Sequence, residues 1–244
     1  MMPMPALSGI CRTALLVGLL SAVSGAANAQ DVSLTLGDEG SLTLRSIQLI
    51  ALLTVLSLAP GIAITVTCFP FIVTVLSILR QAIGLQASPP NMLIVSLAMF
   101  LTYFVMEPVF LQAYTNGLAP LAAGELTPDA AFSATLDPFR AFMSARVDPE
   151  TLEHLRSLRS DAEADALAVL VPSFLLSEIS RAFQIGFLVF MPFLIIDMVA
   201  AAVLMSMGMM MVPPAIVSLP FKLAFFVVVD GWTLVSGALV RSYH

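Results

Sequence analysis

Charged side chains stand at unusual places in the second half of the chain, within or beside long apolar segments. They are Glu178, Arg181, Asp197 and Lys222. Because an ionised side chain is costly in hydrocarbon, such residues are expected to face other parts of the protein. Lys222 has apolar neighbours on both sides and needs a carboxylate, and Glu178 lies just before the third apolar segment. We therefore expect a Glu178–Lys222 ion pair, within one chain or between neighbouring chains, with Asp197–Arg181 as the competing pair.

Catalytic chemistry has little support in the sequence. Glu178 and Asp197 could act as a catalytic carboxylate pair, although ion pairs and helix-to-helix hydrogen bonds are the more common use of intramembrane carboxylates. His154 and His244 lie far apart without a cysteine partner, which disfavours a zinc site. No glycine-rich loop precedes a lysine followed by serine or threonine. We expect no enzyme, no metal, no cofactor and no nucleotide site.

A run of methionines, MSMGMMM, is the most distinctive local feature. Its members are Met205, Met207, Met209, Met210 and Met211, five of the 14 methionines of the chain. Methionine is unbranched and polarizable, so a cluster of it can close around differently shaped groups. Gly208 loosens the helix and Pro213-Pro214 ends it, which places the methionines at a turn between two apolar segments. The run indicates a flexible apolar seal, with ordinary packing against lipid or core as the alternative.

Composition places these residues in a membrane protein. Of the 244 residues, 59% are hydrophobic and 11% are charged, whereas soluble domains have roughly 45–50% and about 25%. Acidic residues outnumber Lys and Arg by 16 to 10. A phosphate-binding face cannot be built from that balance, which excludes nucleic acid as a partner.

Four apolar segments follow one another, two in residues 47–111 and two in residues 185–244. Each is interrupted by proline, charge or both, which simple lipid-exposed spans avoid. Because proline removes a backbone donor and clashes with the preceding turn, we expect broken or kinked helices or helical hairpins. The expected hinge residues are Pro60, Gly61, Pro70, Pro192, Gly208, Pro213 and Pro214. The sequence thus predicts an all-α integral membrane protein whose segments face one another.

The N-terminal 29 residues have the pattern of a cleavable signal peptide. Arg12 precedes a short apolar run, and small residues then lead to an A-x-A pattern that ends at Ala29. We expect cleavage between Ala29 and Gln30, which leaves residues 30–46 as an extracytoplasmic segment. The alternative is a first transmembrane helix, but the apolar run is shorter than the ~20 residues that a span needs.

Residues 112–184 form the one long polar stretch. Three times a capping residue precedes a proline, at Thr127-Pro128, Asp137-Pro138 and Asp148-Pro149. Proline is harmless at the first helical position, so each pair predicts the start of a short helix. The stretch is acidic, and the positive-inside rule then favours a mainly extracytoplasmic position for this insertion.

Two long runs resemble the signature regions of the FliP family, the flagellar type III export-gate membrane proteins. They are PSFLLSEISRAFQIGF, residues 172–187, and PFLIIDMVAAAVLMSMGMMMVPP, residues 192–214. The resemblance extends from about Ile47 to the C-terminus and is weakest in the polar insertion. A cleavable signal is similar to flagellar members of the family rather than to injectisome relatives.

The resemblance implies a function and partners. FliP-like chains assemble as a pentameric ring with FliQ-like and FliR-like membrane proteins, as the core of a gate for unfolded flagellar subunits. It implies contacts with lipid and with further membrane proteins of the export apparatus, in the bacterial inner membrane at the flagellar basal body. The helices would then form a cone. The broken segments fit this arrangement, because irregular backbone and buried charge can be satisfied against protein.

The resemblance also implies roles for single residues. The run from Met205 to Met211 matches the family loop that seals the narrowest part of the pore, and we expect Met209, Met210 and Met211 to line it. Glu178 and Lys222 match charged positions of the family.

Other functions stay open at this point. An injectisome-type homologue is one alternative. A small-solute transporter would also place charges in apolar segments, but it would be expected to show internal repeats, and none is convincing. A purely structural membrane scaffold is the third alternative.

Overall fold

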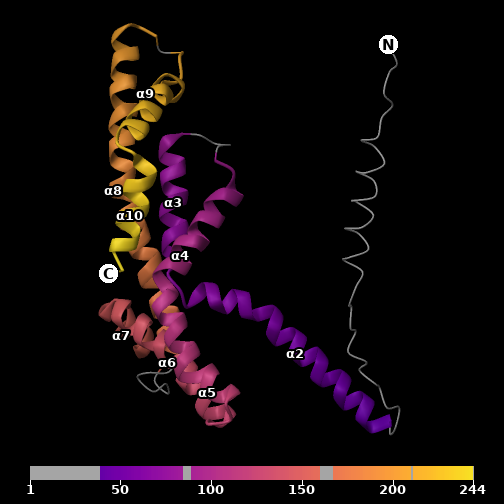
Figure 1. The fold of residues 1–244 in the computed structure, drawn as a ribbon. Coiled ribbons are helices and arrows are strands. Elements are labelled where there is room, and N and C mark those ends of the chain that lie inside the picture. Colours follow the sequence, from indigo (N-terminus) through magenta and orange to yellow (C-terminus); the bar gives the residue numbers. More distant parts are fainter. Residues whose placement is uncertain (1–38, 85–88, 160–166, 210, 244) are drawn as a thin grey trace, which may run out of the picture. The chain divides into compact units, whose positions relative to one another are not determined.

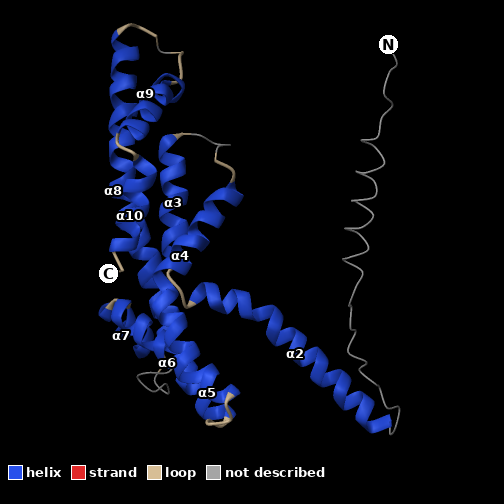
Figure 2. Cartoon of the chain, viewed as in Figure 1, coloured by secondary structure: helices blue, strands red, loops and turns tan. Residues whose placement is uncertain are grey.

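The computed structural model describes residues 39–84, 89–159, 167–209 and 211–243. Within these ranges every regular element is a helix and none is a strand (Figure 2). Three helical stretches are long and apolar enough to cross a membrane, and a bent helix pair can supply a fourth. The prediction of an all-α membrane protein is confirmed. The expected signal peptide, its cleavage site at Ala29–Gln30 and residues 30–38 lie outside the described residues.

The first described helix is α2, Glu39–Thr65. The chain divides between Val55 and Leu56 into two compact units, and the sites discussed below lie in the second. From Arg45 to Thr65 the side chains of α2 are mainly apolar, and none in its most hydrophobic stretch is buried. The helix runs without a break through the expected hinge at Pro60–Gly61. The expected break is therefore absent, because a helix already formed on both sides tolerates the loss of one backbone hydrogen bond.

Helix α3, Phe69–Ile83, is the buried centre of the second unit. The break between α2 and α3 falls at residues 66–68, directly before Pro70 in the first turn of α3, as expected. Five side chains at helical spacing are fully buried: Phe71, Ile72, Val75, Leu76 and Leu79. Helices α4, α8 and α9 pack around α3 (Figure 1). An apolar helix covered on most sides is typical of a core rather than of a lipid-exposed span.

Helix α8, Leu167–Ser206, is the longest element, with 40 residues. At 1.5 Å per residue it is roughly 60 Å long. It begins inside the range predicted as polar insertion, and it continues through Pro172 and the expected hinge Pro192. Pro192 therefore does not break the helix, which packs against α3, α6, α7 and α9 on either side of its prolines. Tertiary contacts of that extent outweigh the local cost of a proline.

Within the described residues of the polar insertion, two of the three predicted helix starts are found. Helix α6, Pro128–Arg146, begins after Thr127, whose hydroxyl accepts a hydrogen bond from the Ala130 N–H at 3.4 Å. Helix α7, Pro149–Ser157, begins after Asp148, whose carboxylate accepts from the Thr151 N–H at 3.0 Å. The start predicted at Asp137-Pro138 was wrong, because Pro138 is buried within α6. A proline in a helix already nucleated upstream removes one hydrogen bond without stopping it.

The insertion connects to α4, Asn91–Ala113, through a π-helical turn and a short helix. The π-helix η1, Tyr114–Leu118, leads into α5, Ala119–Ala122. Helix α6 lies against this turn so closely that a Cβ on Gly117 would stand 2.0 Å from the Thr135 Oγ1. A π-turn inserts one extra residue and so changes the direction of a helix. Here it brings the end of α4 against α6.

The C-terminal apolar segment is a bent pair of helices. Helix α9, Pro214–Val228, and helix α10, Gly231–Arg241, meet at 61°. The bend lies at Asp230, which has a φ of 48° in the left-handed region. This hinge was not among those expected, although the Asp230-Gly231 dipeptide is a recognised turn signal.

Close packing of α3 on α8 depends on Gly186. A Cβ at that position would stand 2.4 Å from the Ile78 Cδ1. We predict that Gly186→Val lowers the unfolding free energy of the purified protein in detergent by about 1–3 kcal/mol, because it overpacks a tight helix crossing. Thermal or denaturant unfolding measures this change. Gly61→Val is the matched control, since a Cβ at Gly61 meets nothing within 4 Å; equal effects of both substitutions would contradict the assignment.

Candidate functional site

Glu178 lies at the centre of the first charge cluster. It stands on α8 and is completely buried. Its Oε1 accepts a hydrogen bond from the Arg146 Nε at 3.2 Å, and the Arg181 Nη1 lies 3.6 Å from the same oxygen. Its Oε2 accepts a hydrogen bond from the Tyr243 hydroxyl. The buried carboxylate is thus paired and hydrogen-bonded on both oxygens, as its burial requires.

Arg146 connects this carboxylate to the end of the chain. It is the last residue of α6, and its Nη1 donates to the Ser242 carbonyl at 2.6 Å. Its guanidinium carbon lies 3.9 Å from the centre of the Tyr243 ring, within the range of a cation–π interaction. Phe71 and Phe142 contact that ring, with centroids 5.5 Å and 6.0 Å away. The cluster therefore joins α3, α6, α8 and the segment after α10.

The pKa values of Tyr243 and Asp148 are shifted by their surroundings. Burial, and after it the nearby Glu178 carboxylate, raises the pKa of Tyr243, so the phenol stays protonated and remains a donor. The Asp148 N–H donates to the Ser177 Oγ at 2.9 Å, which ties the start of α7 to α8 next to Glu178. Hydrogen bonds from the Thr151 hydroxyl and N–H lower the pKa of Asp148, so this cap is charged at neutral pH.

Lys222 lies at the centre of the second charge cluster. It stands on α9 with 5% of its surface exposed. Its Nζ donates to the Asp197 Oδ2 on α8 at 2.6 Å and to the Ala82 carbonyl at 3.1 Å. Ser218, one turn before Lys222, donates to the other oxygen of Asp197. Asp197 is partly exposed, and a polar cavity of about 660 Å³ that also borders Arg80 and Asn91 opens beside it.

The lysine also caps the C-terminus of α3. That helix ends at Gly84, which has a φ of 85°, and the Ala82 carbonyl is one of the last-turn acceptors left without a helical partner. A cation near the C-terminus of a helix interacts favourably with its dipole. Lys222 therefore holds α3, α8 and α9 together through a carboxylate and a helix end.

The first alternative of the prediction, a Glu178–Lys222 pair within one chain, is wrong, because each residue has another partner. Glu178 and Asp197 stand 19 positions apart on one helix, which is roughly 28 Å along its axis. Lys222 forms its ion pair with Asp197. Glu178 is paired instead with Arg146, a residue that the sequence did not single out. The competing Asp197–Arg181 pair does not form either. The same separation excludes Glu178 and Asp197 as a catalytic pair, since two carboxylates that share a substrate lie within ~10 Å.

The methionine run lies where α8 ends. The Met209 N–H donates to the Leu204 carbonyl at 3.0 Å and the Gly208 N–H to the Met205 carbonyl at 3.1 Å, with Gly208 at a φ of 74°. These two bonds form a Schellman motif, which stops a helix sharply. Gly208 thus ends the helix, where Pro213-Pro214 was expected to end it, and the prolines stand instead at the start of α9.

The methionine side chains of this turn face outward. Met205, Met207, Met209 and Met211 are between 40% and 98% exposed, and Met210 lies outside the described residues. Below the turn, α8 and α9 enclose an apolar groove of about 580 Å³ that Met207 and Met209 border together with Val203 and Phe221. The arrangement offers a polarizable apolar contact surface and no reactive group. Among the described residues, no group of His, Cys, Asp and Glu is placed to hold a metal ion.

The fold and the sites together define a class of protein. It is an α-helical membrane protein whose buried charges pair within the chain and whose methionine turn is exposed. The FliP family model matches residues 52–239. A flagellar biosynthetic protein FliP of Caulobacter vibrioides is 50% identical over 245 aligned residues, covering 96% of this chain and 92% of its own. FliP proteins of Bacillus subtilis and Aquifex aeolicus are 44% and 41% identical, covering 81% and 96% of this chain and 92% and 100% of their own. The chain belongs to the FliP family.

The observed pairing can be separated from the expected one by a double-mutant cycle. We predict that Lys222→Met and Asp197→Asn are non-additive by about 0.5–3 kcal/mol in unfolding free energy, because each removes the partner of the other. Lys222→Met and Glu178→Gln should be additive within error. Unfolding of the purified variants in detergent provides the free energies. Coupling of Lys222 to Glu178 and not to Asp197 would overturn the assignment.

Tyr243 supplies a donor that the sequence does not reveal. We predict that Tyr243→Phe destabilises the protein by about 1–3 kcal/mol, because the ring contacts persist while a buried carboxylate loses one of its donors. Tyr103→Phe is the control, since Tyr103 is 62% exposed. The same unfolding measurement serves both variants. An unchanged midpoint for Tyr243→Phe would show that the hydroxyl does not support Glu178.

Proposed function

We propose that this protein is a core component of the bacterial flagellar type III export gate, in which the loop of Met205 to Met211 seals the passage around unfolded flagellar subunits. The observation that carries the proposal is the exposed methionine turn at the tip of the α8–α9 pair. Related proteins from several bacteria carry the name flagellar biosynthetic protein. The proposal places the protein in the bacterial inner membrane, at the flagellar basal body.

Two features support a seal: flexible methionine side chains at the turn, and an ion pair that holds the two helices below it together. Gly208 ends α8 sharply, so Met207, Met209 and Met211 project from the turn that follows the helix. Ion-paired Asp197 and Lys222 hold α8 and α9 together below the turn. Methionine has three rotatable bonds, so these side chains can close around chains of different shape while the backbone that carries them stays fixed.

Surface apolarity supports assembly with other subunits. The most hydrophobic stretch of α8 is only 11% buried within the chain. Its exposed side chains include Phe183, Phe187, Leu194 and Met198. A continuous face of this kind is typical of a lipid contact or a subunit interface. We propose that it serves a pentameric ring of this chain with FliQ-like and FliR-like proteins, arranged as a helical cone.

The protein is proposed to catalyse no reaction. Glu178 and Asp197 are each engaged by a cation of the same chain, and energy for export would come from other proteins. An injectisome homologue is disfavoured because the relatives above are flagellar proteins by name. A solute transporter is disfavoured because it would be expected to show internal repeats, and none in the sequence is convincing.

A test of the seal replaces its side chains. We predict that the triple variant Met209→Ala, Met210→Ala and Met211→Ala raises ion leakage across the membrane of cells that produce the complete export apparatus, because alanine leaves the passage open. The triple Met→Leu variant should stay closed, since leucine restores the apolar volume. Membrane conductance or dye entry measures the leak, and swimming in soft agar measures export.

The control for this test is Met99→Ala, which removes an exposed methionine of α4 that is not part of the run from Met205 to Met211. It should leave leakage unchanged. If the loop variant leaks no more than this control, the methionines serve packing and not sealing.

A further inference from the structure

Helix α10 and the two residues after it form one continuous piece, residues 231–243, which we call the α10 segment. The N–H groups of Ser242 and Tyr243 each donate to a carbonyl of the last turn of α10 at 3.0 Å. The hydroxyl of Tyr243 in turn donates to the buried carboxylate of Glu178. The residue that reaches Glu178 is therefore fixed to the end of α10 by the hydrogen bonds of the helix.

The opposite end of the α10 segment is the 61° bend between α9 and α10. Asp230 lies at this bend with a φ of 48° and a ψ of 54°, and among the described residues it is the one non-glycine residue with a positive φ. Aspartate adopts the left-handed region more readily than most residues. Hinges between helices are built from a few residues of this kind at the ends of elements. The α10 segment thus has a pivot at one end and Tyr243 at the other.

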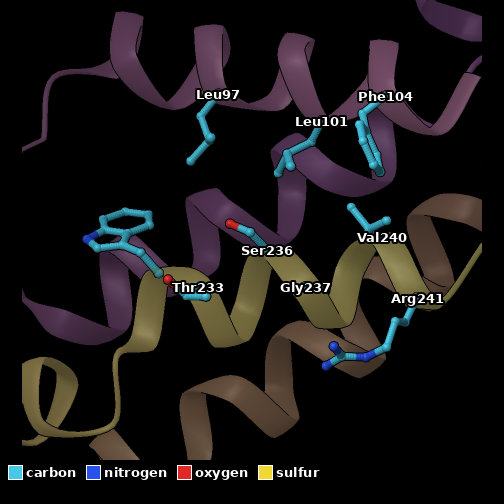
Figure 3. A pocket seen from close by; sticks show the side chains of 9 residues that line it. Leu97, Leu101, Phe104, Thr233, Ser236, Gly237, Val240 and Arg241 are labelled. Atoms are coloured by element: carbon cyan, nitrogen blue, oxygen red, sulfur yellow. The ribbon is translucent and has the colours of Figure 1, made fainter. Parts of the chain in front are cut away.

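Between these two ends α10 is packed along one row of residues. Gly231, Val235 and Leu239 are its buried residues, and with Tyr243 they stand at intervals of four, which places them on one face of the helix. Toward α4 the surface has a shallow hollow of about 650 Å³, and side chains of α4 face α10 across it (Figure 3). An element with so few buried contacts opens at a lower free energy than the core of the same protein.

The contacts that hold Tyr243 leave one donor of Arg146 unused. Arg146 donates through Nε to the Oε1 of Glu178 at 3.2 Å and through Nη1 to the Ser242 carbonyl at 2.6 Å. Its Nη2 is buried and has no hydrogen-bond partner among the described residues. The acceptor that remains on Glu178, Oε2, is taken by the Tyr243 hydroxyl.

The unused donor is placed to replace Tyr243. A guanidinium presents Nε and Nη2 side by side, and a carboxylate can bind this fork through both of its oxygens. In Arg146 the Nε of the fork already binds the Oε1 of Glu178, so Nη2 is the neighbouring donor for Oε2. If Tyr243 left, Glu178 could turn both oxygens to the fork and keep two hydrogen bonds. A buried carboxylate is tolerated only while it has such partners.

We propose that the α10 segment is a releasable strap that pivots at Asp230 and is fastened through Tyr243. In the fastened state the Tyr243 hydroxyl and the Nε of Arg146 share the carboxylate of Glu178. In the released state Arg146 binds both oxygens of Glu178 through Nε and Nη2. Because the buried charge is satisfied in both states, α10 can detach while α6 and α8 stay folded. The strap uses no residue of the methionine turn, so its failure would leave the proposed seal untouched.

The first experiment measures release with two thiols of one molecule. Val235→Cys places a thiol on the buried face of α10, and Cys68 is buried in the core around α3. The full-length protein in detergent is labelled with N-ethylmaleimide, and peptide mass spectrometry follows each thiol separately. The introduced thiol is expected to react about tenfold faster than Cys68 or more, because release exposes it while α3 stays folded. Equal rates would show that α10 opens only when the whole protein unfolds, and would overturn the proposal.

The fastening is tested by Tyr243→Phe in the same labelling experiment. Loss of the hydroxyl removes one hydrogen bond of the fastened state, so the thiol of Val235→Cys should react about tenfold faster. Tyr103→Phe is the matched control, since Tyr103 is exposed, and it should leave the rate as it is. An equal rate with and without the Tyr243 hydroxyl would show that this group does not fasten α10, and would overturn the proposal.

The exchange of partners is tested by Arg146→Lys. The ratio of the two labelling rates depends on how stable the released state is relative to the unfolded protein. Lysine keeps the charge but offers no fork, so the released state loses its bond to Oε2 and the ratio should fall about tenfold. Arg181→Lys is the matched control at the same carboxylate, with its Nη1 3.6 Å from the Oε1 of Glu178, and should preserve the ratio. A ratio that Arg146→Lys leaves unchanged would show that the fork does not form, and would overturn the proposal.

Discussion

The burial of Glu178 is the constraint on which the second unit of the structure depends. A carboxylate without exposure in an apolar helix is tolerated only when cations and donors reach it. Arg146 comes from the polar insertion and Tyr243 from the segment after α10. Three parts of the chain that are remote in sequence must therefore meet at one point of α8. The polar insertion is part of the helical core for this reason, and its position relative to α8 is set by a charge.

The second cluster repeats this principle closer to the methionine turn. Lys222 satisfies Asp197 and the open end of α3 together. Between the two clusters α3 packs on α8 with fully buried apolar side chains and the close approach at Gly186. Charges at two levels thus fix the register of the helices, while apolar packing supplies most of the contact. The methionine turn lies beyond the Asp197–Lys222 cluster. Its side chains can therefore change conformation without loosening α8 and α9.

Local signals in the sequence predicted local structure well. Thr127-Pro128 and Asp148-Pro149 begin helices because a capping oxygen and a first-turn proline act within a few residues. Pro214 stands in the first turn of α9, where the missing N–H of a proline costs nothing, although no side chain caps this helix. Prolines inside helices were harder to judge. Pro60, Pro138 and Pro192 do not interrupt their helices, because the cost of one lost hydrogen bond is local whereas the helix is held by contacts along its length.

The sequence by itself determined the class of the protein: composition indicates a membrane, long apolar segments indicate helices, and Gly208 with Pro213-Pro214 places the run from Met205 to Met211 at a turn. It also showed that Glu178, Asp197 and Lys222 need partners. Only the tertiary structure decided which partners, giving Arg146 and Tyr243 to Glu178 and Lys222 to Asp197. The physical reason is that a charge requires an opposite charge within a few ångströms. Which residues come that close depends on the helices that lie side by side, and the packing of whole helices determines this.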